Sequence, residues 1–299
     1  MLGRPRRTAC LPPVRKILVL RGGALGDFVV TLPALALLRQ SWPAARIELA
    51  GNAAAAALAL SEGLLNAVHS QDEARWSALY GSAPLPAALA HWFAEFDLIL
   101  SFWPDPDGEL RRRFPVRAGQ TFLPAGASPT RPPAAAHYCE ALRPLGLQTQ
   151  NYFHALISER RPAVRRIALH PGSGSPRKNW PLERWAELGV WIAHKHHSEL
   201  LIVTGEAEAP GVLAGLGTPA HNLPLPELAT QLSRCQLFLG HDSGVSHLAA
   251  ALGVPCVLLF GPTDPAMWAP PAPHVRVIRR GSEMTAISVA DVQRALPLR

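Results

Sequence analysis

The sequence predicts an α/β protein made of two Rossmann-like domains, each with a parallel sheet, that face each other across a cleft. Three observations predict this class. The length of 299 residues is about twice that of an average domain. Short β-branched apolar runs alternate with segments of helical spacing in both halves. Glycine-rich turns follow several of these runs, which is where open parallel sheets bind their ligands.

The first domain is assigned to residues 1–155. Its predicted elements are, in order, a strand over 16–21, a glycine turn, a helix that Asp27 opens and that continues to 40, a strand over 46–50, a strand over 97–102 and a helix over 134–145. Gly146 ends the last of these helices. This order of strand, turn, helix and strand is typical of a parallel α/β sheet.

A polar, proline-containing and basic stretch over 148–164 predicts the linker, and the second domain is assigned to residues 156–299. Its predicted elements are strand 166–170, helix 182–196, strand 200–204, helix 226–234, strand 237–239, helix 246–252, strand 255–260, strand 275–278 and helix 288–296. The terminal helix is assigned to the second domain, with packing against the first domain as an open alternative.

The composition indicates a packed globular protein, because 48% of the residues are hydrophobic and 17% are charged. The longest apolar run is too short to cross a bilayer, and the N-terminus has no signal-peptide pattern. The four cysteines lie far apart and are interpreted as reduced thiols. We therefore expect a cytoplasmic protein, with peripheral attachment to the inner membrane as an open alternative.

The net charge of +7 is concentrated in two places. Five basic residues and no acid lie within residues 1–16, and the chain without these residues has a charge of +2. The two groups are the arm Arg4, Arg6, Arg7, Arg15 and Lys16 and the cluster Arg111, Arg112, Arg113 and Arg117. Such a distribution does not predict nucleic-acid binding; it favours a solvated arm, or contact with an anionic membrane surface.

The first motif is RGGALGD, which follows the first predicted strand and ends at Gly26 and Asp27. Its glycines allow a ligand to approach the backbone closely. Asp27 is interpreted either as a helix cap or as a general base at the cleft. The motif is not the dinucleotide pattern G-x-G-x-x-G. Glu48 nevertheless lies at the spacing of a ribose-binding acid, so an NAD-dependent oxidoreductase is kept as the less favoured alternative.

Two motifs in the second half predict a phosphate site. HPGSGSPRKNWP contributes backbone N–H groups and hydroxyls near Ser173 and Gly174, and Lys178 adds a compact cation. GHDSGVSH places Asp242, Ser243 and Gly244 at the N-terminus of a helix, where backbone N–H groups bind anions, and we expect the nearby His247 to face the ligand. TGEAE ends another strand, and either Glu206 or Glu208 is a candidate for a ribose contact.

No metal site is predicted. His194, His196 and His197 lie at a helix end, where the helix dipole favours them.

These residues resemble a known family. LRGGALGDFVVTLPALALLRQSWPAARIELA resembles the N-terminal signature of the family 9 glycosyltransferases, the heptosyltransferase-like enzymes of lipopolysaccharide synthesis. IALHPGSGSPRKNWPLERWAEL and DSGVSHLAAALGVPCVLLFGPTDPAMWAP are similar to its two C-terminal signatures, in the same order. The resemblance implies the GT-B fold and an inverting, metal-independent transfer from a nucleotide-diphosphate sugar that needs no cofactor.

The resemblance also implies roles for individual residues. It makes Asp27 the catalytic base and Lys178 the ligand of the diphosphate, within the loop of Ser173 and Gly174. It assigns nucleotide and phosphate contacts to Asp242, Ser243, Gly244 and His247, and a ribose contact to Glu206 or Glu208. The implied donor is ADP-heptose, and the implied acceptor is a lipopolysaccharide core or another cell-envelope glycolipid. A nucleotide-sugar-binding protein without catalytic activity is the main alternative.

Overall fold

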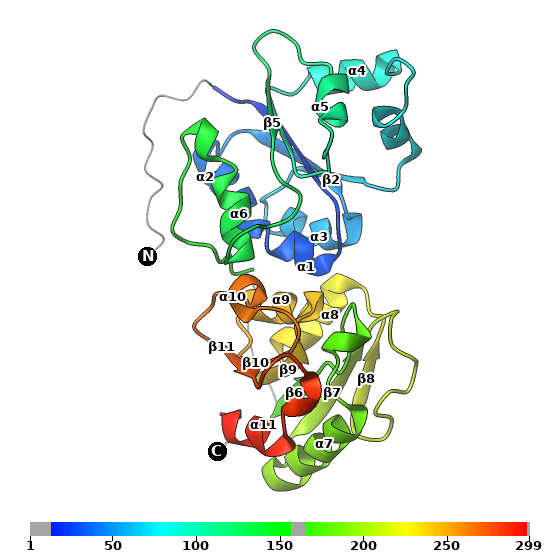
Figure 1. Cartoon of the computed structure of the whole chain (residues 1–299), viewed down its shortest axis with the longest axis vertical. Helices are drawn as coiled ribbons and strands as arrows, with labels where there is room; N and C mark the ends of the chain where they lie inside the picture. The colour runs from blue at the N-terminus through cyan, green and yellow to red at the C-terminus, as the bar shows by residue number, and fades with distance from the viewer. Residues whose placement is uncertain (1–12, 157–164, 298–299) are drawn as a thin grey trace. The chain divides into compact units, whose positions relative to one another are not determined.

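The computed structural model describes residues 13–156 and 165–297. Arg4, Arg6 and Arg7 of the predicted basic arm, Cys10 and residues 157–164 of the predicted linker lie outside the described residues. The contacts divide the chain into unit 1, Met1–Tyr152, and unit 2, Phe153–Arg299. Each unit is an α/β structure with its own parallel sheet (Figure 1).

Unit 1 contains a five-stranded sheet in which every pair of neighbours is parallel. The strand order is β3 (Ala67–Ser70), β2 (Arg46–Gly51), β1 (Lys16–Arg21), β4 (Leu98–Ser101) and β5 (Thr121–Pro124). From β1 the chain builds outward through β2 and β3, and it then crosses to β4 on the other side. The carboxyl ends of β1 and β4 therefore flank the point where strand order reverses, which is where sheets of this kind bind ligands.

The helices of unit 1 differ in three respects from the sequence prediction: those over 53–61, 87–94 and 109–113 were not predicted, the helix predicted over 134–145 ends at Glu140 before a separate 3-10 turn at Arg143–Leu145, and the helix predicted from Asp27 is divided. They are α1 (Leu25–Val29), α2 (Leu32–Ser41), α3 (Ala53–Ser61), α4 (Ala87–Ala94), α5 (Glu109–Arg113) and α6 (Ala134–Glu140). The single helix predicted from Asp27 to 40 is wrong, because α1 begins at Leu25 and a break at Val30 and Thr31 separates it from α2. Proline favours the first turn of a helix, and Pro33 stands in the first turn of α2.

Unit 2 contains a six-stranded parallel sheet. Its order is β11 (Val275–Arg279), β10 (Cys256–Phe260), β9 (Leu237–His241), β6 (Arg166–Leu169), β7 (Glu199–Thr204) and β8 (Thr218–His221). The helices are α7 (Leu182–His196), α8 (Leu225–Ser233), α9 (Gly244–Ala251), α10 (Pro265–Trp268) and α11 (Val289–Ala295). Counted from β6, the order is that of the Rossmann fold, and the reversal lies between β6 and β9.

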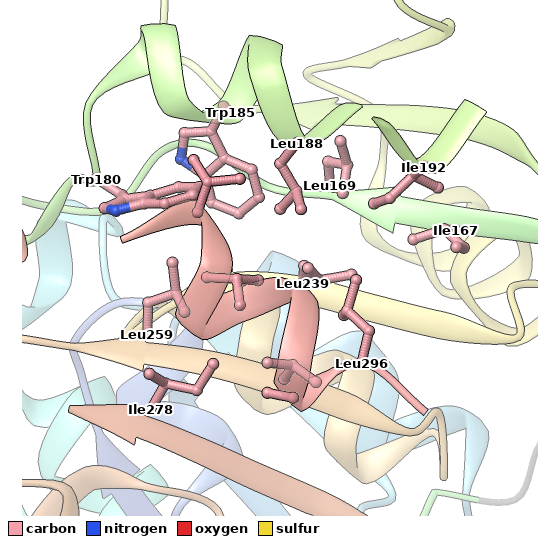
Figure 2. Packing of buried hydrophobic residues seen from close by; sticks show 14 of the residues in the cluster. Ile167, Leu169, Trp180, Trp185, Leu188, Ile192, Leu239, Leu259, Ile278 and Leu296 are labelled. Carbon is pink, nitrogen blue, oxygen red and sulfur yellow. The ribbon is translucent and has the colours of Figure 1, made fainter. Parts of the chain in front are cut away.

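The core of unit 2 lies between this sheet and the helices α7 and α11 (Figure 2). Trp180 and Trp185 are fully buried there, with ring centroids 5.3 Å apart in an edge-to-face arrangement. Val289 and Val292 of α11 belong to the same cluster, so the terminal helix packs on α7 and β11 within unit 2. Burial of each large apolar side chain stabilises the unit by about 1.5–3 kcal/mol.

No helix in the described part of the chain is both long enough and apolar enough to cross a membrane.

Candidate functional site

The glycine turn of unit 1 lies at the carboxyl end of β1, beside the strand reversal. Gly23 has a φ of +103°, and a Cβ atom there would lie 2.8 Å from the Cβ of Asp27, so only glycine fits. Asp27 stands in the first turn of α1, where its Oδ2 accepts the N–H of Ala24 at 3.1 Å. Its side chain is nevertheless 40% exposed. The carboxylate therefore caps the helix start and also remains accessible to a ligand.

Two polar side chains that sequence reasoning missed adjoin this turn. A Cβ atom on Gly22 would lie 3.1 Å from Oε1 of Gln71 and 3.7 Å from Nε1 of Trp103. Gln71 follows β3 and Trp103 follows β4, so parallel pairing brings both to the edge of the sheet that carries Asp27. The sequence offered a signal for Trp103, because this residue directly follows the predicted strand 97–102. It offered none for Gln71, because the preceding strand β3 was not predicted.

The two motifs of unit 2 for which the sequence predicts phosphate binding meet at its strand reversal. Residues 170–178 follow β6 and residues 242–244 follow β9, and the two strands are neighbours in the sheet. Nζ of Lys178 lies 3.3 Å from Oδ2 of Asp242, although the two residues are 64 positions apart. Their side chains are 23% and 10% exposed. The structure thus brings together the cation and the helix start that the sequence predicted for one ligand.

The hydroxyl groups in these motifs hold the loops in shape. Oγ of Ser243 accepts the N–H of Ser246 and caps α9, and Oγ of Ser173 contacts Oδ1 of Asn179 at 2.6 Å. In the described chain, the first-turn N–H groups of Gly244 and Val245 have no protein acceptor. The groups available to bind an anion are therefore Lys178 and these backbone N–H groups, which lie at the positive end of α9.

The remaining predicted contacts of this motif differ in exposure. Gly174 is exposed in its loop, and a Cβ atom there would meet open space. His247 lies in α9 and is only 6% exposed.

His241 is a residue of this site whose role the sequence prediction did not identify. It ends β9 and is fully buried. Its Nδ1 donates to the carbonyl of Gly172 at 3.2 Å, and its Nε2 accepts the N–H of Trp180 at 2.9 Å. Because one partner only accepts and the other only donates, the ring is the neutral Nδ1–H tautomer. Burial lowers the pKa of His241 to about 3, which keeps the ring neutral at physiological pH.

The structure separates the two candidate acids of the β7 loop. Glu206 is exposed. Glu208 is half-buried, and its Oε2 accepts the N–H of Gly205 at 2.7 Å. A Cβ atom on Gly172 would overlap the carboxylate of Glu208, so this acid packs directly on the loop that follows β6. Glu208 therefore lies beside the motif that carries Lys178.

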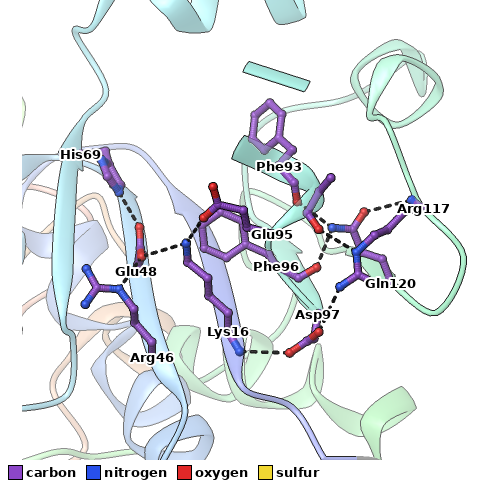
Figure 3. A network of polar contacts seen from close by, with 11 residues as sticks. Lys16, Arg46, Glu48, His69, Phe93, Glu95, Phe96, Asp97, Arg117 and Gln120 are labelled. Carbon is purple, nitrogen blue, oxygen red and sulfur yellow. Dashed lines mark hydrogen bonds and ion pairs between the residues drawn. The ribbon is translucent and has the colours of Figure 1, made fainter. Parts of the chain in front are cut away.

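Glu48 has a structural environment that explains its presence without a ribose (Figure 3). It lies in the middle of β2 and not at the carboxyl end of that strand. Its carboxylate contacts Nε of Arg46 at 2.7 Å, Nε2 of His69 at 2.8 Å and Nζ of Lys16 at 3.5 Å. Burial alone would raise the pKa of Glu48, but the hydrogen bonds from His69 and Arg46 and the charge of Lys16 lower it to about 2.

Within residues 13–156 and 165–297, no group of three or more His, Cys, Asp or Glu side chains is arranged to hold a metal ion. Cys139 is buried in α6, and this burial raises the pKa of its thiol to about 12.

In comparisons with known proteins, the family model of glycosyltransferase family 9 (heptosyltransferase) matches residues 146–296, which make up half of the chain. Lipopolysaccharide heptosyltransferase 2 of Escherichia coli is 31% identical over 134 residues, covering 41% of this chain and 38% of that enzyme. The chain thus matches well under half the length of this relative.

The same fold is found in solved structures. A family 9 glycosyltransferase from Veillonella parvula superimposes with a TM-score of 0.77 at 21% identity, covering 94% of this chain and 96% of that one. The E. coli heptosyltransferase WaaC with ADP gives a TM-score of 0.73 at 20% identity, covering 94% and 98%. These likenesses show the fold, and with the two parallel sheets they confirm the predicted GT-B class.

Proposed function

The chain belongs to glycosyltransferase family 9, and we propose that it transfers a sugar from a nucleotide-diphosphate donor to a cell-envelope glycan. One observation carries the proposal. Lys178 and the start of α9 converge at the strand reversal of unit 2, and this convergence supports a diphosphate site there. A family match alone would supply no such chemistry, because function depends on the site and not on the fold.

The donor is proposed to bind unit 2 through its diphosphate. Lys178 and the N–H groups of Gly244 and Val245 provide the positive field, and Ser173 and Gly174 shape the loop opposite Asp242 and Ser243. His247 lies on the same helix. Glu208 is the better of the two candidate acids for the ribose, because its carboxylate packs on the loop after β6 whereas Glu206 is exposed. The E. coli structure with ADP makes ADP-heptose the first donor to test.

The proposed reaction is an inverting displacement. An acceptor hydroxyl attacks the anomeric carbon and forms the new C–O bond, while the bond from that carbon to the diphosphate oxygen breaks and the nucleotide diphosphate leaves. Asp27 takes the proton of the acceptor hydroxyl, a role for which its accessible carboxylate is suited. Lys178 and the N–H groups at the start of α9 stabilise the charge that develops on the leaving diphosphate. The proposal includes neither a metal ion nor a cofactor.

The acceptor is proposed to be a glycolipid, either the lipopolysaccharide core or another envelope glycan. Arg111, Arg112 and Arg113 lie in α5, the next helix after β4. A cavity of about 450 Å³ near β5 and one of about 400 Å³ lined by Tyr80, Ser82, Arg112 and Arg113 lie in the same unit. We propose that these arginines meet an anionic lipid surface, which would place a cytoplasmic protein peripherally on the inner membrane.

The alternatives make different predictions. A nucleotide-sugar-binding protein without catalytic activity would bind the donor and transfer nothing to any acceptor. An NAD-dependent oxidoreductase would need an acid at the end of β2, yet Glu48 lies inside that strand and contacts three basic side chains. That arrangement counts against the dinucleotide alternative.

The testing experiment begins with donor binding. ADP, UDP and GDP are titrated by calorimetry into the full chain and into its Lys178→Ala variant, with NAD as the contrasting ligand. The corresponding nucleotide sugars are then incubated with a lipopolysaccharide core acceptor, and released nucleotide diphosphate and product are measured. We expect a nucleotide diphosphate to bind in a way that depends on Lys178, and transfer to follow. Tight binding of NAD alone would contradict the proposal, and donor binding without turnover would favour the inactive binding protein.

A further inference from the structure

Arg21 is a buried cation that has no role in the reaction proposed above. It ends β1 and is 5% exposed. An arginine so far removed from water is costly unless its charge and its N–H groups are matched. In the part of the chain that the structure describes, Asp27 is the carboxylate within ion-pair distance of Arg21, with Nη2 and Oδ1 separated by 3.4 Å. Arg21 therefore directs its charge at the proposed base.

The contacts of Arg21 form a closed set around Asp27. Nη2 donates to the carbonyl oxygen of Asp27 at 2.9 Å and to the hydroxyl of Tyr138 at 2.8 Å. Nε donates to Oγ1 of Thr31 at 3.0 Å, and that hydroxyl in turn donates to the same carbonyl oxygen of Asp27 at 2.8 Å. The guanidinium also lies over the ring of Tyr138, 4.6 Å from its centroid. The ion pair and the hydrogen bonds to the Asp27 carbonyl constrain Asp27, whereas the contacts with Thr31 and Tyr138 hold the guanidinium itself.

The break between α1 and α2 makes this arrangement possible. In a continuous helix the carbonyl of Asp27 would accept the N–H of Thr31, four residues later. Here the N–H of Thr31 turns instead to the carbonyl of Phe28, at 2.9 Å. The carbonyl of Asp27 is thereby released to accept Arg21 and the Thr31 hydroxyl. The backbone of Asp27 is thus held by side chains, and the break is a built feature of the turn.

Tyr138 links this set to a distant element. It lies in α6, 117 residues from Arg21, and is fully buried. Burial raises the pKa of Tyr138, so its hydroxyl stays protonated and can donate to the carbonyl of Ala127 at 3.1 Å while it accepts from Arg21. The loop after β5 and helix α6 therefore help to hold the guanidinium in place.

We propose that Arg21, held by Tyr138, is a positioning residue for Asp27, and this inference rests on the proposed function. The guanidinium fixes Oδ1 while the N–H of Ala24 fixes Oδ2, at 3.4 Å and 3.1 Å. The carboxylate then presents its remaining lone pairs to an acceptor hydroxyl in one orientation, as general-base catalysis requires. Arg21 touches no substrate in this assignment and acts through Asp27.

The test is a double-mutant cycle on transfer by the full chain. Arg21→Gln should lower kcat about tenfold and leave the donor KM unchanged, since a misaligned base loses part of its usual 10²–10⁴-fold contribution. Tyr138→Phe keeps the ring and should cost about two- to fivefold in kcat. In an Asp27→Asn background, Arg21→Gln should cause little further loss, because groups that act through one another are not additive.

Arg39 provides the matched control. It is also in unit 1 and donates to the carbonyls of Ala45 and Leu64 and to Asn66, and among the described residues it forms no hydrogen bond or ion pair with Asp27. Arg39→Gln should lower the melting temperature without lowering kcat. A wild-type kcat in Arg21→Gln would overturn the role of Arg21 and leave the proposed function standing. The same would follow if Arg21→Gln lowered kcat as strongly in the Asp27→Asn background as in the wild type. Absence of wild-type turnover with every donor would overturn the proposed function together with this inference.

Discussion

The imidazole of His241 accepts the backbone N–H of Trp180 at 2.9 Å, across 61 residues of sequence. The same ring donates to the carbonyl of Gly172. Gly172 and Trp180 stand near the two ends of the loop that carries Lys178, so one buried side chain at the end of β9 ties down both sides of the proposed diphosphate loop. Trp180 completes the anchor by donating Nε1–H to the carbonyl of Ile287 at 2.8 Å.

The first prediction concerns this tie. His241→Leu keeps most of the volume but leaves two buried backbone groups without partners, which should destabilise unit 2 by about 2–4 kcal/mol. Donor binding should weaken as well, because Lys178 loses its fixed position. Urea denaturation and calorimetry measure the two effects. His194→Leu, at an exposed histidine of α7 in the same unit, should change stability by less than about 0.5 kcal/mol. Equal effects of the two substitutions would exclude a special role for His241.

The second prediction concerns Lys178, the cation of the proposed donor site. Lys178→Ala should weaken binding of a nucleotide diphosphate by about 10- to 100-fold, the loss expected for one charge-assisted contact. Asp242→Asn separates two effects, because it removes the charge that Lys178 contacts at 3.3 Å. If Asp242 competes with the phosphates for Lys178, this variant binds the diphosphate more tightly; if it orients Lys178, binding weakens. Unchanged calorimetric affinity in Lys178→Ala would remove Lys178 from the site.

The sequence predicted the central strands and the motifs well, for a physical reason. Buried parallel strands such as β1, β6 and β10 are continuous apolar runs, and the turns that follow them need glycine or a helix-capping residue. The edge strands β3, β5 and β8 have four residues each and are largely unburied, so they lack such a pattern. They are defined by pairing with a neighbouring strand, which a local pattern does not show.

The parts of the site that escaped prediction depend on long-range contacts. The break after α1 lies inside an unbroken apolar period, and the pattern therefore predicted one helix. Arg21 was predicted only as the end of the first strand and the start of the glycine motif, because its partner Tyr138 lies 117 positions away. His241 likewise reads as one more polar residue of its motif until the fold brings Gly172 and Trp180 to its two ring nitrogens.

The third prediction concerns the proposed base. Asp27→Asn preserves the shape of the side chain and still allows its oxygen to accept the N–H of Ala24, so α1 should remain folded. Transfer should fall by about 10²–10⁴-fold, because the amide accepts no proton from the acceptor. Donor affinity should stay within about twofold, since the donor residues lie in unit 2. Turnover and calorimetry are measured on the same preparation, and wild-type turnover in the variant would end the assignment.

The fourth prediction concerns stability at low pH. The pKa of Glu48 is lowered from its ordinary value of 4.5 to about 2, so its ionised form stabilises the folded state. This stabilisation is complete at a pH above the pKa that Glu48 has in the unfolded chain, and it is lost as the pH falls from about 5 to 2. Glu48→Gln should therefore lower the free energy of unfolding at pH 7 by about 1–3 kcal/mol, the usual cost of losing hydrogen bonds to a charged group. The variant should also show a shallower fall in stability between pH 5 and 2.

Hydrogen exchange of β1 and β2 peptides in urea measures this free energy in unit 1. Asp97, whose pKa is also lowered by hydrogen bonds and by Arg117 against the effect of burial, titrates at low pH in both proteins, so the difference between their slopes isolates Glu48. Glu95→Gln is the control, because Glu95 contacts the same Lys16 but is 43% exposed, and exposed ion pairs contribute less than about 1 kcal/mol. Parallel stability curves for wild type and Glu48→Gln would show that Lys16, Arg46 and His69 bind the neutral amide as well as the carboxylate.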